Sequence, residues 1–554
     1  MFNNHFDMKK IFALMLVIAA VVACEKKEKE KPGPGPEPET PGVVATVTAP
    51  GGEMKAAWAE GDSFTAIQKT GNDSTFVTFK LVSGAGTAVG SFKAETETAT
   101  EETVWTAVLG KRTSIVGSEI HCTYKGQDGK PASIDDYNYV IATASGLEPA
   151  FDFSKGKALS YVIKVKLPAG IKAIEYTPSA YFAVTNTGID TCLYQAPMYP
   201  DGEPVTEMAA YASSNTSTIT LVNASAAGEE VYIAVPAINF SHSWDMHKGS
   251  NGKFTYKNIE VGVIITILND KSDDATKSNG TVMGEDVSEK GGKSGVIDLS
   301  GVALLSRPKP SEAIHMTATD VRSYDTSGGK YYMDITTDCD IYWAPYNVGA
   351  TSPTEVGNYY AWGELEPKDD YSKDTYTLYE DVKGDGVKTY TIISSRIYGE
   401  KDNSVIGDKG LYTIRGTRYD VARVKWGKAW RMAGVEEAYG LSKGTVTTTA
   451  TAMTITKDGS TVTIPVCGRR EGTTPASAKI VNLWTVDYTA CTWLGDQAAF
   501  KDATSGKDCA WMISNTKKNL NDIDFYSGSL YREYGLPVRA VLATSSVVLK
   551  EKSE

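Results

Sequence analysis

The chain has 554 residues, of which 41% are hydrophobic and 22% charged, so its length suits roughly three or four globular domains and its composition excludes wholesale disorder. The formal net charge of −12 argues against a nucleic-acid partner, which would need a basic face. Thirty tyrosines and frequent threonines favour sheet over helix.

The N-terminus has the pattern of a secretion signal. Two lysines precede an apolar run, residues 11–22, which is too short to cross about 30 Å of hydrocarbon. The run ends in Ala23 and Cys24, and this ending resembles the lipobox of bacterial lipoproteins. The resemblance implies that residues 1–23 are removed and that acyl chains on Cys24, palmitate among them, anchor the protein in the cell outer membrane. The alternative is an ordinary secretory signal with a chance cysteine.

Residues 24–42 predict a tether. The segment after Cys24 reads EKKEKEKPGPGPEPETPG, which cannot bury a core and which proline keeps extended. Its charged start resembles the tract that follows the lipidated cysteine in surface-exported Bacteroidetes lipoproteins. We therefore expect a surface-exposed protein held away from the membrane.

Residues 43–150 predict a first antiparallel β-sandwich. Short alternating runs are separated by Gly, Asn and Asp turns about every ten residues. The pattern W-x-E-G-D at residues 58–62, followed by a strand, a turn, an alternating strand and SGAGT, resembles the fimbrillin family of Bacteroidetes pilins. We expect Trp58 to be a core anchor and Asp62 to form a turn.

Residues 151–315 predict a second fimbrillin-like sandwich. In YVIKVKLP the apolar residues Ile163, Val165 and Leu167 alternate with lysines, which is typical of a strand with one buried face. The run VGVIITIL is continuously apolar, so we expect a central strand there. A proline-broken linker, residues 306–313, ends this part.

The fimbrillin resemblance implies a way to assemble. Members of that family polymerise by donor-strand exchange, in which one subunit completes the sheet of its neighbour. Proteolysis near the start of the first sandwich opens the groove, and Lys55 is our candidate processing site. The resemblance thus implies other fimbrial subunits as partners.

Residues 316–544 resemble the Fibrobacter succinogenes major paralogous domain, with 545–554 as a charged tail. The matching motifs are Trp343–Ala350, Gly357–Glu364, Trp426–Met432, Ile464–Arg470, Leu483–Thr485 and Gly535–Val541. The sequence departs from the family pattern at Ala433 with Gly434, at Cys467 and at Ala540. The domain is similar to the C-type-lectin-like fold, so the expected fold class is mainly β: two antiparallel, pilin-like β-sandwiches followed by an α+β domain.

Local patterns agree with an α+β domain. In GVEEAYGL, the residues Val435, Ala438 and Tyr439 share one helical face. The segment TAMTITKDGSTVTIPV predicts a hairpin whose turn contains Asp458 and Gly459, a pair that fits a type I′ turn.

The same domain lacks the residues of common catalytic sites. None of the five histidines of the chain lies in residues 316–544, which excludes Ser-His-Asp and Cys-His catalysis and histidine-ligated zinc there. We predict no catalytic residue, no metal site and no cofactor, although calcium at the carboxylate-rich segment EPKDDYSKD stays open. Cysteines other than Cys24 form no CxxC motif, so we expect isolated buried thiols, with pairing undecided, at Cys122, Cys192, Cys339, Cys467, Cys491 and Cys509.

Aromatic and charged side chains remain as a binding surface. Sugars stack on aromatic faces while carboxylates and guanidinium groups bind their hydroxyls. The candidate ligand-binding residues are Tyr359, Tyr360, Trp362, Glu364, Arg469, Arg470 and Trp484. The competing interpretation makes Trp362 and Trp484 core residues.

Three functions compete on the sequence alone. The first is a fimbrial surface lipoprotein, best placed at the tip of a pilus, whose C-terminal module adheres to a host or bacterial glycan or protein. The second is a surface lipoprotein that binds glycan or protein without polymerising. The remote third is an enzyme of the formylglycine-generating type, for which no cysteine motif argues. The tail could alternatively act as a donor strand.

Overall fold

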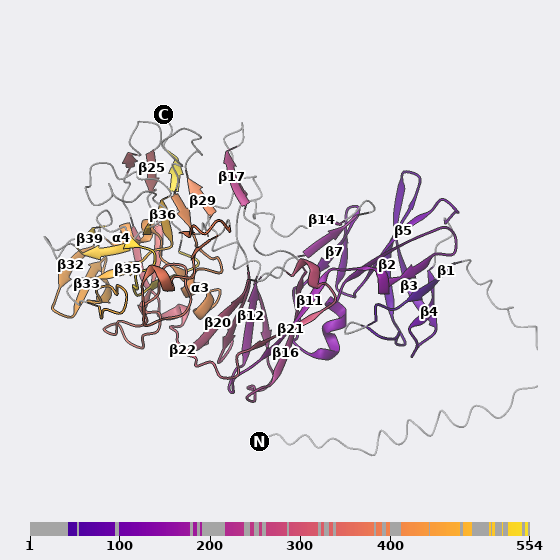
Figure 1. Ribbon diagram of the computed structural model, residues 1–554, viewed down its shortest axis with the longest axis horizontal. Coiled ribbons are helices and arrows are strands. Elements are labelled where there is room, and N and C mark those ends of the chain that lie inside the picture. Colours follow the sequence, from indigo (N-terminus) through magenta and orange to yellow (C-terminus); the bar gives the residue numbers. More distant parts are fainter. Residues whose placement is uncertain are drawn as a thin grey trace, which may run out of the picture.

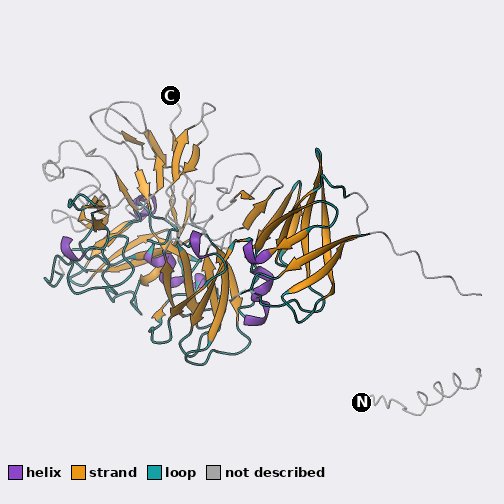
Figure 2. Cartoon of the chain, turned by 45° about the vertical axis from the view of Figure 1, so that its right-hand side comes forward, coloured by secondary structure: helices purple, strands orange, loops and turns teal. Residues whose placement is uncertain are grey.

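The protein is mainly β, with its strands arranged along an elongated molecule in the computed structural model (Figures 1 and 2). The structure describes residues 42–51, 55–94, 99–177, 181–185, 189–190, 216–237, 244–248, 254–257, 262–284, 287–318, 323–325, 332–335, 339–381, 384–390, 395–398, 411–441, 444–476, 480–489, 509–510, 512–515, 523–524, 530–545 and 549–551. Within these residues the apolar side chains form three large buried clusters, one in each successive part of the chain. No helix among them has the length and apolar character needed to cross a bilayer.

The first part is an eight-stranded sheet with its own buried core. The strand order is β10-β8-β5-β2-β3-β4-β1-β9. The bounds are β1 (Val43–Thr48), β2 (Ser63–Thr70), β3 (Asp73–Ser83), β4 (Val89–Ala94), β5 (Val104–Leu109), β8 (Val140–Ser145), β9 (Ala150–Asp152) and β10 (Lys157–Ala158). Trp58 is 1% exposed and its ring lies 4.9 Å from that of Phe92, so its predicted core role is confirmed. The Asp62 carboxylate accepts a hydrogen bond from the Ala59 amide at 2.6 Å and so forms the predicted turn.

The second part is a sandwich of two sheets. One has the order β16-β11-β21 and the other β15-β12-β19-β20-β22. The bounds are β11 (Ser160–Lys166), β12 (Ala173–Thr177), β15 (Ser217–Thr220), β16 (Glu230–Pro236), β19 (Val263–Leu268), β20 (Lys277–Met283), β21 (Ser294–Asp298) and β22 (Leu305–Ser306). Every residue of β19 is buried and the strand lies between β12 and β20, which confirms the prediction of a central strand. Ile163, Val165 and Leu167 are buried as their alternation predicted.

A four-stranded sheet joins these two parts across residue 150. Its order is β14-β13-β7-β6, and β7 pairs with β13. The bounds are β6 (Thr113–Val116), β7 (Glu119–Thr123), β13 (Tyr181–Val184) and β14 (Ile189–Asp190). A separate hairpin consists of β17 (Trp244–Lys248) and β18 (Phe254–Lys257). The short 3-10 helices are η1 (Pro131–Tyr137), η2 (Phe153–Lys155), η3 (Ser288–Lys290) and η4 (Pro310–Glu312). The predicted division at residue 150 therefore cuts through a shared sheet, and the domain boundaries stay predictions.

Among its described residues, the C-terminal part combines small sheets with two short α-helices. Its central sheet has the order β23-β26-β41-β31. The bounds are α3 (Val421–Trp426), α4 (Val435–Leu441), η5 (Lys373–Thr375), β23 (Ile314–Ala318), β24 (Ser323–Asp325), β25 (Tyr332–Ile335), β26 (Cys339–Asn347), β27 (Tyr379–Glu380), β28 (Thr389–Tyr390), β29 (Ser395–Tyr398), β30 (Leu411–Thr413), β31 (Trp430–Met432), β32 (Thr445–Thr448), β33 (Ala452–Lys457), β34 (Ser460–Pro465), β35 (Asn482–Trp484), β36 (Asp487–Thr489), β37 (Cys509–Ala510), β38 (Met512–Asn515), β39 (Ile523–Asp524), β40 (Leu530–Tyr531), β41 (Arg539–Leu542) and β42 (Leu549–Glu551).

Two local predictions for this part are confirmed. The predicted helix is α4, and Ala438 on its expected apolar face is fully buried. The predicted hairpin is β33–β34, and its turn residues Asp458 and Gly459 have φ angles of 51° and 80°. Positive φ at both central positions is what a type I′ turn requires. Helix α3 was not predicted.

Candidate functional site

The motif Asn347–Glu364 starts and ends in the core of the C-terminal part and reaches the surface between Thr351 and Glu355. Gly349 and Gly357 have φ angles of 83° and 76°, and a Cβ at Gly357 would lie 2.6 Å from the carbonyl oxygen of Val348. These turns bring the chain beside the motif Gly535–Val541, where the Tyr360 amide donates a hydrogen bond to the carbonyl of Leu536 at 2.9 Å. Both glycines are therefore structural.

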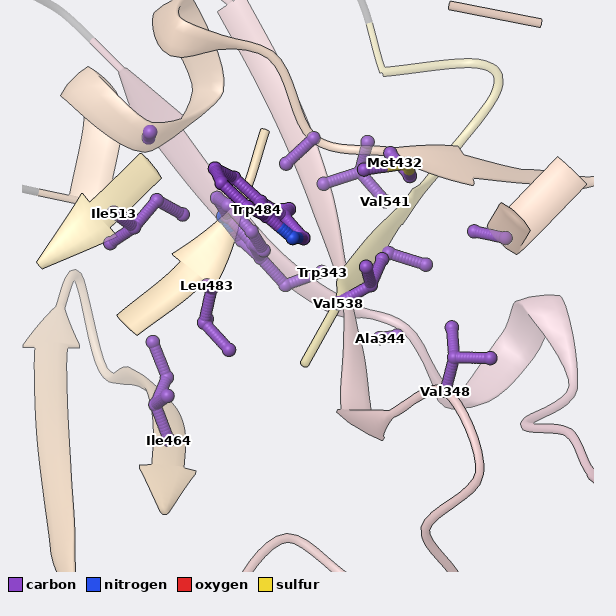
Figure 3. Close-up of a cluster of buried hydrophobic side chains, with 14 of the residues drawn as sticks. Trp343, Ala344, Val348, Met432, Ile464, Leu483, Trp484, Ile513, Val538 and Val541 are labelled. Carbon is purple, nitrogen blue, oxygen red and sulfur yellow. The ribbon is translucent and has the colours of Figure 1, made fainter. Parts of the chain in front are cut away.

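Three of the seven candidate ligand-binding residues lie in the core. Tyr360, Trp362 and Trp484 are at most 1% exposed. Trp362 Nε1 donates to the carbonyl of Thr485 and Trp484 Nε1 to the carbonyl of Tyr360, both at 2.8 Å. Figure 3 shows Trp484 among apolar side chains of the core. A ligand cannot stack on these rings, so the competing core interpretation holds for Trp362 and Trp484, and Tyr360 is a core residue that it did not include.

Glu364 and Arg470 fasten one loop rather than face solvent. The Glu364 carboxylate accepts hydrogen bonds from the amide and hydroxyl of Thr377 at 2.7 and 2.8 Å and pairs with Lys368 Nζ at 2.7 Å. Arg470 donates to the carbonyl of Asp369 at 3.0 Å, and its guanidinium lies 5.0 Å from the ring centre of Tyr371. Together they hold the loop 365–372, which we call the acidic loop.

Tyr359 lies at the edge of the core. Its hydroxyl donates to the carbonyl of Cys467 at 2.6 Å, and burial raises the pKa of this phenol to about 12. The hydroxyl therefore stays protonated at neutral pH. Cys467 and Cys122 are buried free thiols, as predicted, and burial raises the pKa of each thiol to about 12.

Arg469 is the candidate that reaches the surface. Its side chain is 42% exposed and forms an ion pair with Glu471. Its guanidinium lies 5.4 Å from the ring centre of Tyr534, and that ring lies edge-on to Tyr531, which is 38% exposed, at 5.7 Å. We call these four residues the Arg469 patch.

The Arg469 patch presents aromatic, cationic and anionic groups side by side. Such a set can stack a sugar ring or an aromatic side chain and bind its polar groups. Tyr531 and Tyr534 were not among the predicted binding residues, although they immediately precede the matched segment Gly535–Val541. Tyr534 reaches Arg469 beside the antiparallel bridge between Arg470 and Gly535, which joins segments that lie far apart in the sequence.

The described residues contain no group of three or more His, Cys, Asp or Glu side chains placed to hold a metal ion. The acidic loop is instead occupied by its own contacts. Lys368 donates to the carbonyl of Thr375 at 3.0 Å as well as pairing with Glu364.

At the other end of the chain, β1 is an inserted strand and not an edge. It pairs with β4 in antiparallel and with β9 in parallel orientation, and Val43, Ala45 and Val47 point into the core. Lys55 follows in an isolated bridge with Gly51, and its Nζ pairs with Asp62 at 3.1 Å. Cys24 lies outside the described residues.

No protein-family model matches the chain, and no curated protein matches it significantly. Several solved structures resemble it over part of its length, among them two bacterial proteins. One is a proposed cell adhesion protein from Bacteroides ovatus, with 12% identity and a TM-score of 0.26, covering 48% of this chain and 94% of that one. The other is the C-terminally truncated tip fimbrial protein Mfa3 from Porphyromonas gingivalis, with 10% identity and a TM-score of 0.21, covering 45% of this chain and 86% of that one. These scores carry no argument about function.

Proposed function

We propose that the protein is a fimbrial surface adhesin whose C-terminal part carries the binding surface. One observation carries the proposal: the sheet that contains β1 and the part that bears the Arg469 patch lie at opposite ends of the molecule (Figure 1). A chain fixed through residues before Val43 would thus present the patch at its far end. The proposed anchor is lipidated Cys24 in the outer membrane.

The tip position is favoured by the chain's own tail. β42 pairs with β25, so Leu549–Glu551 already belongs to a sheet of the same molecule. A donor strand must instead be free to enter a neighbour. We therefore propose that the subunit accepts a strand and does not supply one.

The acceptor site would be the place of β1. Removing a strand with three inward apolar residues would open a groove between β4 and β9. Cleavage after Lys55 would release β1 together with the Cys24 anchor, so the donor strand of a neighbouring subunit would then hold the protein at the same end. The test is to trim the full chain with a lysine-specific protease and add a fimbrillin subunit, with Lys55→Gln as the uncleaved control. A strand-exchanged complex from the trimmed wild type alone is expected; no complex after complete cleavage at Lys55 would reject the polymerising function.

A surface protein that never polymerises is the second candidate, and the burial of Lys55 favours it. The Lys55 side chain is only 17% exposed and ion-paired, so a protease meets it only after local opening. Resistance of Lys55 to protease in the folded chain would support this second candidate.

We further propose that the binding activity is recognition and not catalysis, and that the Arg469 patch contacts a glycan or a protein. A glycan array and a cell-binding assay with the full chain would test it. Tyr534→Ala should lose at least tenfold in binding, whereas the distant surface change Val222→Ala should not. Equal binding by Tyr534→Ala would place recognition elsewhere.

A further inference from the structure

We infer that the second sandwich and the C-terminal part form one cooperative unit, in which the sandwich completes helix α3 and Lys425 links this junction to the acidic loop. The binding surface would then depend on a neighbouring part of the chain. This inference does not rest on the proposed function, because its test needs no ligand.

Helix α3 is held at both of its ends. At its start, the buried carboxylate of Asp420 accepts hydrogen bonds from the amides of Arg423 at 3.0 Å and Gly416 at 3.1 Å. At its end, the carbonyls of Val424 and Lys425 lie in the last turn, where a helix offers no internal donors.

The second sandwich supplies the missing donors. Thr266 of β19 donates its hydroxyl to the Val424 carbonyl at 2.9 Å, and Ser278 of β20 donates to the Lys425 carbonyl at 2.7 Å. All six residues of α3 are buried. A six-residue helix is not stable by itself, so these external bonds are part of what keeps it folded.

The backbone of β20 touches the helix directly at Gly280. A Cβ at this position would lie 1.8 Å from the Val424 carbonyl oxygen and 2.7 Å from its carbon, both backbone atoms. Only glycine allows this approach. The position therefore offers a way to separate the two surfaces with one methyl group.

Charged side chains also cross the junction. Arg423, which is 2% exposed, donates to the hydroxyls of Thr177 and Thr216 at 2.9 and 2.6 Å. Glu175, which is 1% exposed, accepts a hydrogen bond from the Lys428 amide at 2.7 Å. Partial opening would break these bonds while the groups were still shielded from water, so opening is expected to be cooperative.

Lys425 connects the junction to the acidic loop. Its side chain is 3% exposed, and Nζ donates to the carbonyl of Gly280 at 3.1 Å and pairs with Glu366. Glu366 lies in the acidic loop, whose other end is held by Arg470, the neighbour of Arg469 in the patch. Displacing β20 from α3 should therefore loosen the loop.

Hydrogen exchange of the full chain, followed by mass spectrometry, tests the inference. In Gly280→Ala, amides of residues 421–426 and of the acidic loop should both exchange at least tenfold faster. The matched control is Gly301→Ala, where a Cβ meets nothing within 4 Å, and it should exchange like the wild type.

A second variant separates the two steps. Lys425→Met keeps the backbone contact of Gly280 but removes the link to Glu366, so it should speed exchange in the acidic loop more than in α3. If Gly280→Ala does not fold, Lys425→Met still tests whether the junction is coupled to the acidic loop. Unchanged loop exchange in Lys425→Met would overturn the coupling, and unchanged α3 exchange in folded Gly280→Ala would overturn the cooperative unit.

Discussion

Replacing Glu437 by glutamine should destabilise the C-terminal part strongly and in a pH-dependent way. This carboxylate is fully buried and lies between two arginines: it pairs with Arg431 and lies 3.7 Å from Arg415. It also accepts a hydrogen bond from the Gly434 amide at 2.6 Å. The amide of glutamine would keep the shape but leave Arg431 without its counter-charge.

The magnitude follows from the environment of this carboxylate. Burial alone would raise its pKa, but the charges of Arg431 and Arg415, together with hydrogen bonds from Arg431 and the Gly434 amide, lower the pKa of Glu437 from 4.5 to about 2. At 1.36 kcal/mol per pKa unit, a shift of about 2.5 units contributes roughly 3 kcal/mol to the free energy of unfolding. Removing one partner of a buried ion pair costs about 3–5 kcal/mol, which agrees.

The sign of the pH dependence is fixed by the direction of the shift. Because the folded-state pKa is depressed, the contribution is complete above pH 4.5 and is lost as the pH falls towards 2. The difference in free energy of unfolding between wild type and Glu437→Gln should therefore narrow by about 2 kcal/mol from pH 7 to pH 3. The reason is that pH 3 lies about 1.5 pH units below the unfolded-state pKa of 4.5, and each unit is worth 1.36 kcal/mol.

Urea unfolding followed by tryptophan fluorescence measures this difference. Seven of the ten tryptophans lie in residues 316–544, so the signal reports mainly on that part. The exposed Asp374, changed to asparagine, is the matched carboxylate-to-amide control and should change stability little. A difference for Glu437→Gln below about 1 kcal/mol at pH 7, or one that does not narrow in acid, would refute the reasoning.

Three further outcomes are expected. Trp58→Ala should cost the first part about 3–5 kcal/mol, because it empties a fully enclosed site; calorimetry showing an unshifted transition would contradict this. Gly357→Ala should destabilise more than Gly459→Ala in thermal unfolding, because both have positive φ but only the former also meets a backbone oxygen, at 2.6 Å; equal losses would mean that the close approach is relieved. Cys24→Ala should abolish incorporation of labelled palmitate, and retained label would rule out this anchor.

Alternation made many strands predictable. The inward sets of β3 and β11, such as Val77 with Phe79 and Ile163 with Val165, are buried as a period of two requires. The hairpin turn at Asp458 was equally local, since a two-residue type I′ turn is set by its own backbone angles.

Helix α3 could not be predicted in the same way. In VARVKW an arginine and a lysine interrupt the apolar residues, and charged residues normally indicate an exposed helix face. In the structure both are buried against another part of the chain. Only the tertiary contacts with Thr266 and Ser278 reveal why charges are tolerated there. Tertiary context thus overrode the local pattern.

The sequence could not reveal which of the candidate binding residues are exposed. A motif tryptophan such as Trp362 looks the same in sequence whether it stacks on a ligand or fills a core. Its burial depends on a segment about 170 residues later in the chain. There the Trp362 amide donates a hydrogen bond to the carbonyl of Arg532 at 2.8 Å. Exposure at Arg469 likewise follows from neighbours distant in sequence.

The position of β1 determines how the molecule resists a mechanical load. A pull on the chain before Val43, along the strand axis, enters the fold through a strand that is paired over six residues with β4 and over three with β9. Such a load shears all of these pairings at once instead of opening them one after another. In the uncleaved chain, the first strand of the fold is therefore placed where a load on the residues before it meets all of these pairings together.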